Sequence, residues 1–552
     1  MMDFEIPLGK RTKRYRFLEM LPAVLSYGAL VLLVVLSFIS PVLASIYLLL
    51  MVLSAFTRTV AIAYRMIAGR KNMEKFSAVD WHQRLEDLSN PKDSYALLRG
   101  KDSKEAGYYN HLENLRLMAA AEPGTFPKPS EIYNALIMPA YNESIEVIEP
   151  ALSSVLDVSY DKKNLIVVFA YEERGGADIE KTAKLLQKKY SKYFHSFHIV
   201  KHPKDLPNEV VGKGGNITFA GKWLQGYLKQ QKIPLSNVIV TTMDCDNKPH
   251  KKYFDYLTYE YIVHDDRKHF SYQPICIFTN NIWDVPAPMR VLATGNSFWN
   301  IISSMRPHSL RNFASHAQPM DALVEMNFWS TRTIVEDGHQ YWRSYFHFGG
   351  KYSVLPLYIP IYQDAVLSGS YLKTLKAQFV QLRRWAYGAS DIAYVGNILF
   401  SAKRNVPFWA GFTRFIRLLD GHVTLTSVSI LIAIGGWIPL IINGDAARSV
   451  AAHQLPDTIS TLQQIAMIGL AISIFSSFKI LPPRPDRYKK TRNIAMLLQW
   501  VLMPFTAILY GSFSAYNSQT RLFLGKYLDK FDVTDKSTAE MNDRNRHQTG
   551  KK

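Results

Sequence analysis

The chain has 552 residues, more than a single hydrophobic core usually organises, so we expect two or more structural units. Hydrophobic residues make up 48% and charged residues 20%, which excludes a wholly membrane-buried chain and a wholly disordered one. The net charge of +19 suits nucleic acid, an anionic membrane surface or a phosphate-bearing molecule. Cys245 and Cys276 are the only cysteines, so we expect neither a disulfide framework nor a cysteine metal site.

Apolar stretches near the start of the chain predict two membrane-spanning helices. Residues 21–40 carry no charge, and residues 41–56 continue the apolar run. The preceding basic run KRTKRYR argues against a cleaved signal peptide and predicts that the chain starts on the cytoplasmic side. We therefore expect residues 1–70 to form an N-terminal membrane unit, followed over residues 71–130 by a polar helical connector.

The middle of the chain, residues 131–400, has the pattern of an α/β domain. Short β-rich runs such as NLIVVFAY and NVIVTTMD alternate with helix-compatible segments such as KTAKLLQKKY. This alternation predicts a largely parallel sheet covered by helices. In open sheets of this kind, ligands bind at the carboxyl ends of the strands.

Residues 401–420 predict an amphipathic helix at the membrane surface, with Arg414 and Arg417 opposite an apolar face. Three further apolar stretches lie within residues 421–516, namely 421–442, 459–480 and 493–516, which gives five predicted spans in all. Residues 483–492 carry five basic side chains, whereas the loop before residue 459 carries only Arg448, which supports a cytoplasmic α/β domain. Within residues 517–552, the final stretch predicts a disordered tail.

Two elements of the α/β region offer carboxylates. Asp244 and Asp246 follow the strand-like run NVIVTT, and such a pair suits Mg²⁺ or Mn²⁺ while leaving coordination positions for donor phosphates, although single pairs of this kind also arise by chance. Glu336 and Asp337 occur later, in IVEDGH. Asp337 is a candidate general base, and the alternative is that it caps a helix.

Two other elements offer positive charge. Lys213 lies in VGKGGNI, which lacks the spacing of a phosphate-binding P-loop and is either an ordinary turn or a place where lysine meets a phosphate or carboxylate. The run QLRRW combines Arg383 and Arg384 with Trp385. It suits a pyrophosphate beside a sugar, and the alternative is the end of an amphipathic helix near the membrane.

Taken in order, these elements resemble the processive branch of the family 2 glycosyltransferases, which includes the cellulose and hyaluronan synthases. The resemblance covers most of the chain. It rests on PAYNE at 139–143, KGGN at 213–216, D-x-D at 244–246, the V-E-D run ending at Asp337, Q-x-x-R-W at 381–385 and FDVTDK at 531–536. It implies a glycosyltransferase A-type, Rossmann-like domain inserted between transmembrane helices.

The resemblance also implies a role for each matching residue. Asp246 and Asp244 would bind Mg²⁺ or Mn²⁺, Asp337 with Glu336 would carry the catalysis, and Gln381 and Trp385 would contact the acceptor. The donor nucleotide would contact Pro139, Tyr141, Glu143, Glu172, Lys213, Asp244, Arg383 and Arg384. A gating loop would contain Phe531, Val533, Thr534 and Lys536.

The match has two departures and one conflict. Glu172 stands where many relatives carry an aspartate pair, and Val335 replaces the usual threonine before Glu336. Five spans would leave residues 531–536 outside, away from the donor that they should cover. Either residues 493–516 are re-entrant or interfacial, or the count of spans is wrong.

The predicted function is an inverting transfer of sugar from a nucleotide-sugar donor to a growing polysaccharide, with possible export of the product. One alternative is a single transfer to a lipid-linked or short acceptor, and another is a non-catalytic membrane scaffold that binds sugar. The expected partners are the donor, the saccharide or lipid-linked acceptor and the lipid bilayer of the cytoplasmic membrane. Nucleic acid is disfavoured, because much of the lysine and arginine excess flanks membrane segments.

Overall fold

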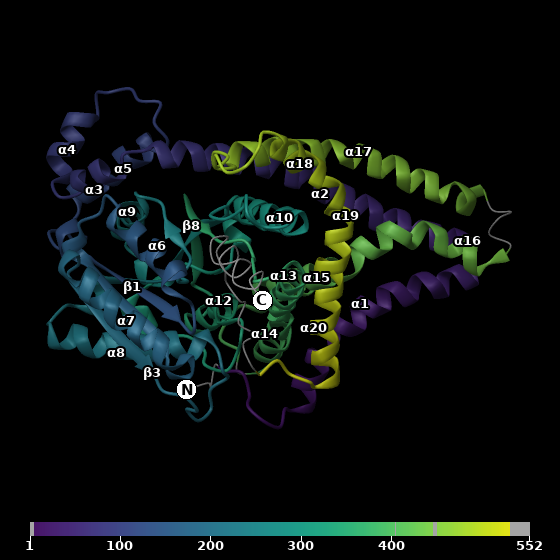
Figure 1. Ribbon diagram of the computed structural model, residues 1–552, viewed down its shortest axis with the longest axis horizontal. Helices are drawn as coiled ribbons and strands as arrows, with labels where there is room; N and C mark the ends of the chain where they lie inside the picture. Colours follow the sequence, from purple (N-terminus) through teal and green to yellow (C-terminus); the bar gives the residue numbers. More distant parts are fainter. Residues whose placement is uncertain (1–4, 403, 445–449, 530–552) are drawn as a thin grey trace, which may run out of the picture.

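An α/β domain occupies the middle of the chain in the computed structural model, which describes residues 5–402, 404–444 and 450–529. In Figure 1 this domain lies on the left, and long helices from both ends of the chain extend from it to the right. The predicted α/β domain between long apolar helices is therefore confirmed.

An eight-stranded mixed sheet forms the centre of the domain, in the order β3-β2-β1-β4-β7-β6-β8-β5. Its strands are β1 (Tyr133–Ala140), β2 (Leu165–Glu172), β3 (Ser196–His202), β4 (Val238–Thr242), β5 (Lys248–Pro249), β6 (Phe270–Phe278), β7 (Ala317–Pro319) and β8 (Ser353–Gln363). The first four strands of this order are parallel, as in a Rossmann-type nucleotide-binding half. The order reverses between β1 and β4, which places a ligand crevice at the carboxyl ends of these two strands.

Helices cover both faces of the sheet, and the strand sequences reflect this. Leu136 and Met138 of β1 pack into a cluster with α6, α7 and α9, whereas Ala135 and Ile137 pack on the other face with α8 and α11. The domain helices are α6 (Ile145–Leu156), α7 (Gly176–Tyr190), α8 (Lys213–Gln230), α9 (Tyr253–Val263), α10 (Ala287–Ser304), α11 (Met320–Glu325), α12 (Glu336–His347), α13 (Tyr371–Ala386) and α14 (Asp391–Leu399). Because strands buried on both faces need apolar residues throughout, β2 is a continuous apolar run until its last residue.

The predicted polar connector packs onto the α/β domain. It comprises α3 (Trp81–Asp87), α4 (Pro91–Leu98) and α5 (Tyr108–Ala120). Trp81 is buried and stacks on Tyr256 of α9 with ring centroids 3.7 Å apart, and Leu115 joins the same core. These helices therefore extend the domain core beyond the sheet.

Four helical stretches of the described residues are long and apolar enough to cross a membrane: Lys13–Ile39 (α1), Pro41–Ala78 (α2), Phe408–Ile442 and Thr491–Leu524. The predicted span at residues 459–480 falls within another helix, α17 (Val450–Ile480), many of whose side chains lie outside the described residues. The predicted total of five spans therefore stays a prediction.

Two predicted boundaries at the C-terminal end differ from the structure. The expected surface helix over 401–420 and the span that follows it are one helix, α15 (Phe408–Ile434), which contains no proline and continues through Gly421 at the predicted boundary. After a short turn, α16 (Ile438–Ile442) follows. The C-terminal unit expected over residues 517–552 also starts inside a helix, since α20 (Phe513–Leu524) continues to Gly525, whose φ of 68° ends the helix. The predicted gating loop lies outside the described residues.

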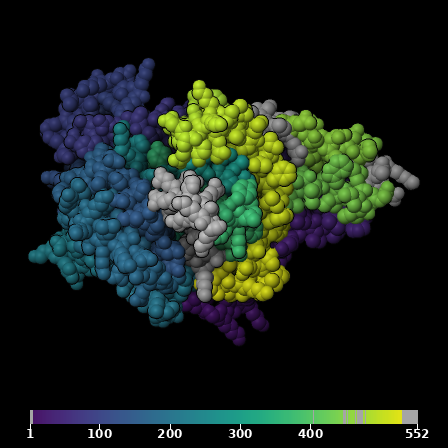
Figure 2. Space-filling model, viewed as in Figure 1, coloured from purple at the N-terminus to yellow at the C-terminus, as the bar shows by residue number. Residues whose placement is uncertain are grey.

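The stretch Thr491–Leu524 runs along the α/β domain and contacts it near both ends. It consists of α18 (Thr491–Leu498), α19 (Met503–Thr506), a π-helical turn and α20. Near its start, Arg290 Nε of α10 donates to Gln499 Oε1 at 2.5 Å, and near its end the Ser518 hydroxyl donates to the carbonyl oxygen of Arg383 on α13. In Figure 1 it crosses the direction of α1, α2 and α17, and in Figure 2 it is a yellow band between the blue domain and the green α17.

This path predicts that residue 526 lies on the same side of the membrane as the α/β domain. Lys526 is exposed just beyond α20, and Gly444 is exposed in the loop before α17. In sealed inverted vesicles and intact cells, we expect a membrane-impermeant thiol reagent to label Lys526→Cys only from the domain side and Gly444→Cys only from the other. Labelling of both variants from the same side would contradict the path, and the native cysteines are buried and give little background.

Candidate active site

The candidate site is a cleft at the carboxyl ends of β1, β2, β4 and β8, closed by the starts of α8 and α12 and by α13. Most residues singled out in the sequence line it: Pro139, Tyr141, Glu143, Glu172, Lys213, Asp244, Asp246, Glu336, Asp337, Gln381, Arg384 and Trp385. Arg383 is not in its wall, and the predicted gating-loop residues lie outside the described part of the chain. The topology thus brings segments almost 250 residues apart to one cavity, while the role of each residue stays a prediction.

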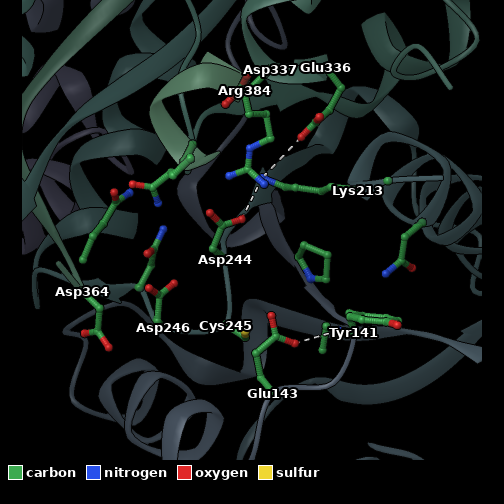
Figure 3. A pocket seen from close by; sticks show the side chains of 18 of the residues that line it. Tyr141, Glu143, Lys213, Asp244, Cys245, Asp246, Glu336, Asp337, Asp364 and Arg384 are labelled. Atoms are coloured by element: carbon green, nitrogen blue, oxygen red, sulfur yellow. Dashed lines mark hydrogen bonds and ion pairs between the residues drawn. The ribbon is translucent and has the colours of Figure 1, made fainter. Parts of the chain in front are cut away.

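Lys213 is the central cation of the cleft. Its Nζ lies 2.8 Å from Asp244 Oδ1 and 3.7 Å from Glu336 Oε1, as the dashed lines in Figure 3 show. Burial favours the neutral amine, but the carboxylates of Asp244, Glu336 and Asp337 outweigh it and raise the pKa of Lys213. The lysine is therefore a permanent positive charge between the two acidic elements.

The position of Lys213 depends on the close packing of the first turn of α8. Gly214 lies so close to the loop between α11 and α12 that a Cβ added to it would be 2.4 Å from the Ser330 carbonyl oxygen. Asn216, one turn into the helix, donates from Nδ2 to the carbonyl oxygen of Ala170 on β2 at 2.9 Å. These contacts explain why glycine and asparagine follow the lysine in KGGN.

Glu336 and Asp337 occupy the first turn of α12. The Gly338 amide donates to Asp337 Oδ1 at 2.7 Å, and the positive end of the helix favours negative charge there. Burial raises the pKa of both carboxyl groups, while the charge of Lys213 acts in the opposite sense. Asp337 is thus a carboxylate with a raised proton affinity that lines the cleft, as a general base requires.

Asp244 and Asp246 follow β4, which places them at the crevice. Asp246 is 7% exposed, and its backbone is held where its carbonyl oxygen accepts from Asn280 Nδ2 at 3.1 Å. Among the described residues, no three His, Cys, Asp or Glu side chains converge closely enough to bind a metal unaided. The two carboxylates nevertheless fit Mg²⁺ or Mn²⁺, since such ions take one or two carboxylates from a protein and complete their coordination with water or with phosphates of a substrate.

Tyr141, Glu172 and Arg174 form the other end of the cleft. The Arg174 guanidinium donates to Glu172 Oε2 at 2.7 and 3.0 Å and lies 5.2 Å from the centroid of the Tyr141 ring. The Tyr141 amide donates to Glu143 Oε2 at 2.7 Å, which shapes the turn after β1. An aromatic face beside a buried carboxylate and a guanidinium is suited to a planar heterocycle.

Trp385 and Arg384, from the last turn of α13, line the same cleft as Glu336 and Asp337. Trp385 is 40% exposed, and its ring centroid is 6.1 Å from that of Phe278 at the end of β6. Burial is the larger effect on the pKa of Glu336 and Asp337, and the positive charge of Arg384 acts against it. The guanidinium therefore influences both carboxylates. The cleft therefore has a half-open aromatic wall next to its charged centre.

The lining residues that escaped the sequence interpretation include Arg174, Asn247, Phe278 and Asp364. Asp364 directly follows β8, and Figure 3 shows it near Asp246. Its position after an apolar strand is the signal that could have identified it, as it did for Asp244. Arg174 and Phe278 carry no such signal, because they reach the cleft through the turn after β2 and the end of a buried strand.

No protein-family model matches the chain, and no curated protein sequence matches it. Solved structures that resemble it include the mannosyltransferase PcManGT from Pyrobaculum calidifontis in complex with GDP-Man and Mn²⁺, with 14% identity and a TM-score of 0.36 over 80% of this chain and 99% of that one. TarS 1-349 from S. aureus in complex with UDP-GlcNAc has 12% identity and a TM-score of 0.33 over 72% of this chain and 93% of that one. Likeness at this level assigns no substrate to the chain.

The packing around Lys213 predicts opposite effects for two glycine substitutions in α8. Gly214→Ala forces its new methyl group against the Ser330 carbonyl, so we expect a loss of about 1–3 kcal/mol in the free energy of unfolding. A Cβ at Gly226 meets nothing within 4 Å, so Gly226→Ala is expected to leave stability unchanged or raise it by about 0.5–1 kcal/mol. Thermal unfolding of the two purified variants measures both, and equal behaviour would refute the packing argument.

Proposed function

We propose that this chain is a membrane-embedded glycosyltransferase that transfers a sugar from a nucleotide-sugar donor by a single, inverting displacement. The observation that carries the proposal is the position of Lys213, which contacts both the Asp244 carboxylate and Glu336, the neighbour of Asp337. One cavity thus holds the pair Asp244 and Asp246 for the donor, Asp337 as a separate base, and the Lys213 cation between them. Transfer from a diphosphate leaving group needs these separate charges, because one group must take a proton while others stabilise the leaving anion.

The donor diphosphate fits the positively charged centre of the cleft. Lys213 stands at the start of α8, where free backbone amides and the helix dipole favour an anion, and Arg384 adds a second cation. Tyr141 and the Arg174–Glu172 pair would hold the nucleobase at the far end. Lys213 would release Asp244 and turn to the diphosphate when the donor binds.

In the proposed reaction, an acceptor hydroxyl oxygen forms a bond to the anomeric carbon while the bond from that carbon to the donor phosphate oxygen breaks. The Asp337 carboxylate takes the hydroxyl proton, and the nucleoside diphosphate leaves with the electron pair. Lys213 and Arg384 stabilise the negative charge that develops on the leaving group. Attack from the face opposite the leaving group inverts the configuration.

Asp246 and Asp244 would hold the divalent cation together with the donor diphosphate. When bound, Mg²⁺ or Mn²⁺ would neutralise part of the diphosphate charge. The rest of the chemistry belongs to side chains of this chain, namely the positioning of the donor and the removal of one proton.

The acceptor would enter beside Trp385. The Trp385 side chain is half-exposed. Its helix, α13, packs against α20, which lies between the domain and α17 in Figure 2. A sugar ring stacked on the indole would present its hydroxyl to Asp337. We propose a growing polysaccharide as the acceptor and the cytoplasmic face of the membrane as the place of synthesis, with a single transfer to a lipid-linked acceptor as the competing outcome.

The base assignment predicts a large and selective loss in Asp337→Asn. We expect its kcat to fall by about 10²–10⁴-fold, because an amide cannot accept the proton, while its Kd for donor stays within about threefold of the unmodified protein. Steady-state assays and donor titration measure both. Asp178→Asn, at an exposed position on α7, is the control and should keep full activity.

The pH dependence gives the same assignment a second readout. Asp337 works as a base only when deprotonated, so kcat/KM is high above its pKa and falls as the pH drops through it. Because burial raises this pKa, the fall should lie above about 3.9, the ordinary value for aspartate. Intact turnover in Asp337→Asn, with an unchanged pH profile, would reject Asp337 as the base.

Product sizing separates a polymerase from a single transferase. Purified protein in lipid vesicles would be incubated with each of several nucleotide sugars, and donor hydrolysis and product length would be measured. We expect one donor to be consumed far faster than the rest and its product to lengthen with time. A product that stops after one addition would reject polymerisation and leave the transfer chemistry standing.

A further inference from the structure

Six arginines from three parts of the chain converge outside the cleft, and we call them the basic cluster. They are Arg58 and Arg65 on α2, Arg306 and Arg311 after α10, and Arg414 and Arg417 on α15. An ion pair of 3.1 Å between Arg58 and Asp420 joins α2 to α15. Arg311 lies 4.0 Å from the Tyr341 ring centroid and Arg414 4.8 Å from that of Tyr345, so both rest on α12.

The charge of the basic cluster is not neutralised by the described residues. Asp420 is the one carboxylate of those residues within ion-pair distance of the cluster, and Arg58 is the arginine with which it pairs. The Nε atoms of Arg306 and Arg414 are buried and have no hydrogen-bond partner in the described part of the chain. Burial lowers the pKa of Arg306, and the charges of Arg65, Arg417 and Arg58 lower it further. Like charges held this close, with unpaired donors, call for an anion.

The basic cluster lies at the level expected for a membrane surface. Trp409, in the first turn of α15, is 74% exposed, and Tyr64, next to Arg65 on α2, is 73% exposed. Exposed tryptophan and tyrosine on apolar helices are typical of the headgroup region of a bilayer. Further along the two helices, Val60, Ile416 and Leu425 are exposed and apolar, as lipid-facing residues are.

We propose that the basic cluster binds the phosphate group of an anionic membrane lipid, with the acyl chains along α2 and α15. This inference rests on the membrane placement in the proposed function. Guanidinium groups suit the ligand because their planar donors pair with phosphate oxygens in bidentate geometry. None of the six arginines lines the catalytic cleft, so the site is separate from that of the donor diphosphate.

The bound lipid would hold three elements together. The phosphate would bridge α2, α15 and the segment that follows α10. Two arginines of the basic cluster, Arg311 and Arg414, already lie over aromatic rings of α12, the helix that carries Asp337. A lipid at this site would therefore stabilise the contact between the membrane helices and the catalytic helix. Its effect should appear first in stability.

Titration of the purified, delipidated full-length protein with phosphatidylglycerol in mixed micelles tests the site. We expect a saturable rise in Tm with phosphatidylglycerol and none with phosphatidylcholine. Arg306→Gln/Arg417→Gln should weaken the apparent Kd by about tenfold or more, since two charge-assisted contacts are lost. Lys489→Gln/Lys490→Gln removes the same charge from another exposed basic stretch and should leave the Kd within about twofold.

Arg417 is exposed, so Arg417→Gln alone should fold and keeps the test decisive if the double variant does not. In the same titration, we expect Arg417→Gln to weaken the apparent Kd for phosphatidylglycerol by about threefold or more. Arg417→Lys should restore the affinity only in part, because lysine lacks the planar, bidentate donors of a guanidinium group. Equal binding by Arg417→Gln and by the unmodified protein would overturn the proposal. So would an equal Tm rise with phosphatidylcholine.

Two further arms identify the source of the phosphate. Saturation by inorganic phosphate, with no further effect of phosphatidylglycerol, would show a soluble ligand and overturn the lipid assignment. Binding of a polyprenyl phosphate about tenfold tighter than phosphatidylglycerol would make the site an acceptor site instead. If the unmodified protein transfers sugar but binds no anionic lipid, this inference alone is refuted. If it binds the lipid but transfers no sugar with any donor, the proposed function alone is refuted.

Discussion

The buried charge of Lys213 is the interaction on which the rest of the site depends. Its Nζ contacts Asp244 and Glu336, and these acids come from β4 and α12, which are far apart in the sequence. A buried lysine without carboxylates would lose its proton, and buried carboxylates without a cation would gain one. Each charge therefore offsets part of the cost of burying the others, and the three elements must assemble together for the cleft to carry its charges.

The fold supplies the geometry for this contact through the sheet. β1 and β4 are parallel neighbours, so their carboxyl ends open on the same crevice, and α8 starts there because Gly214 permits close backbone contact with Ser330. α12 reaches the crevice with Asp337 in its first turn, where the helix dipole opposes protonation. The stretch Thr491–Leu524 packs against α13, the helix that carries Arg383 and Trp385.

Local sequence patterns were sufficient to predict the α/β domain and most of the cleft, and insufficient for the membrane region. β2 and β4 are apolar runs with an acid at or just after the end. That signal led to Asp244, whereas Glu172 was identified through the family resemblance. Arg174 and Phe278 were missed because only tertiary packing brings them to the cleft. The stretch Thr491–Leu524 has the composition of a spanning helix, yet the hydrogen bond between Arg290 and Gln499 joins it to the domain. A local sequence pattern could not reveal this contact, because the two residues are far apart in the chain.

The contact between α1 and α20 has a consequence for the order in which the protein is assembled. Arg16 on α1 donates to the carbonyl oxygens of Leu522 and Phe523, and the Tyr527 hydroxyl donates to Glu19. α1 therefore completes these contacts only after more than 500 further residues have been made. Until then the Arg16 end of α1 is without these partners, and a chain that stops before residue 520 lacks them even when every residue that lines the cleft is present.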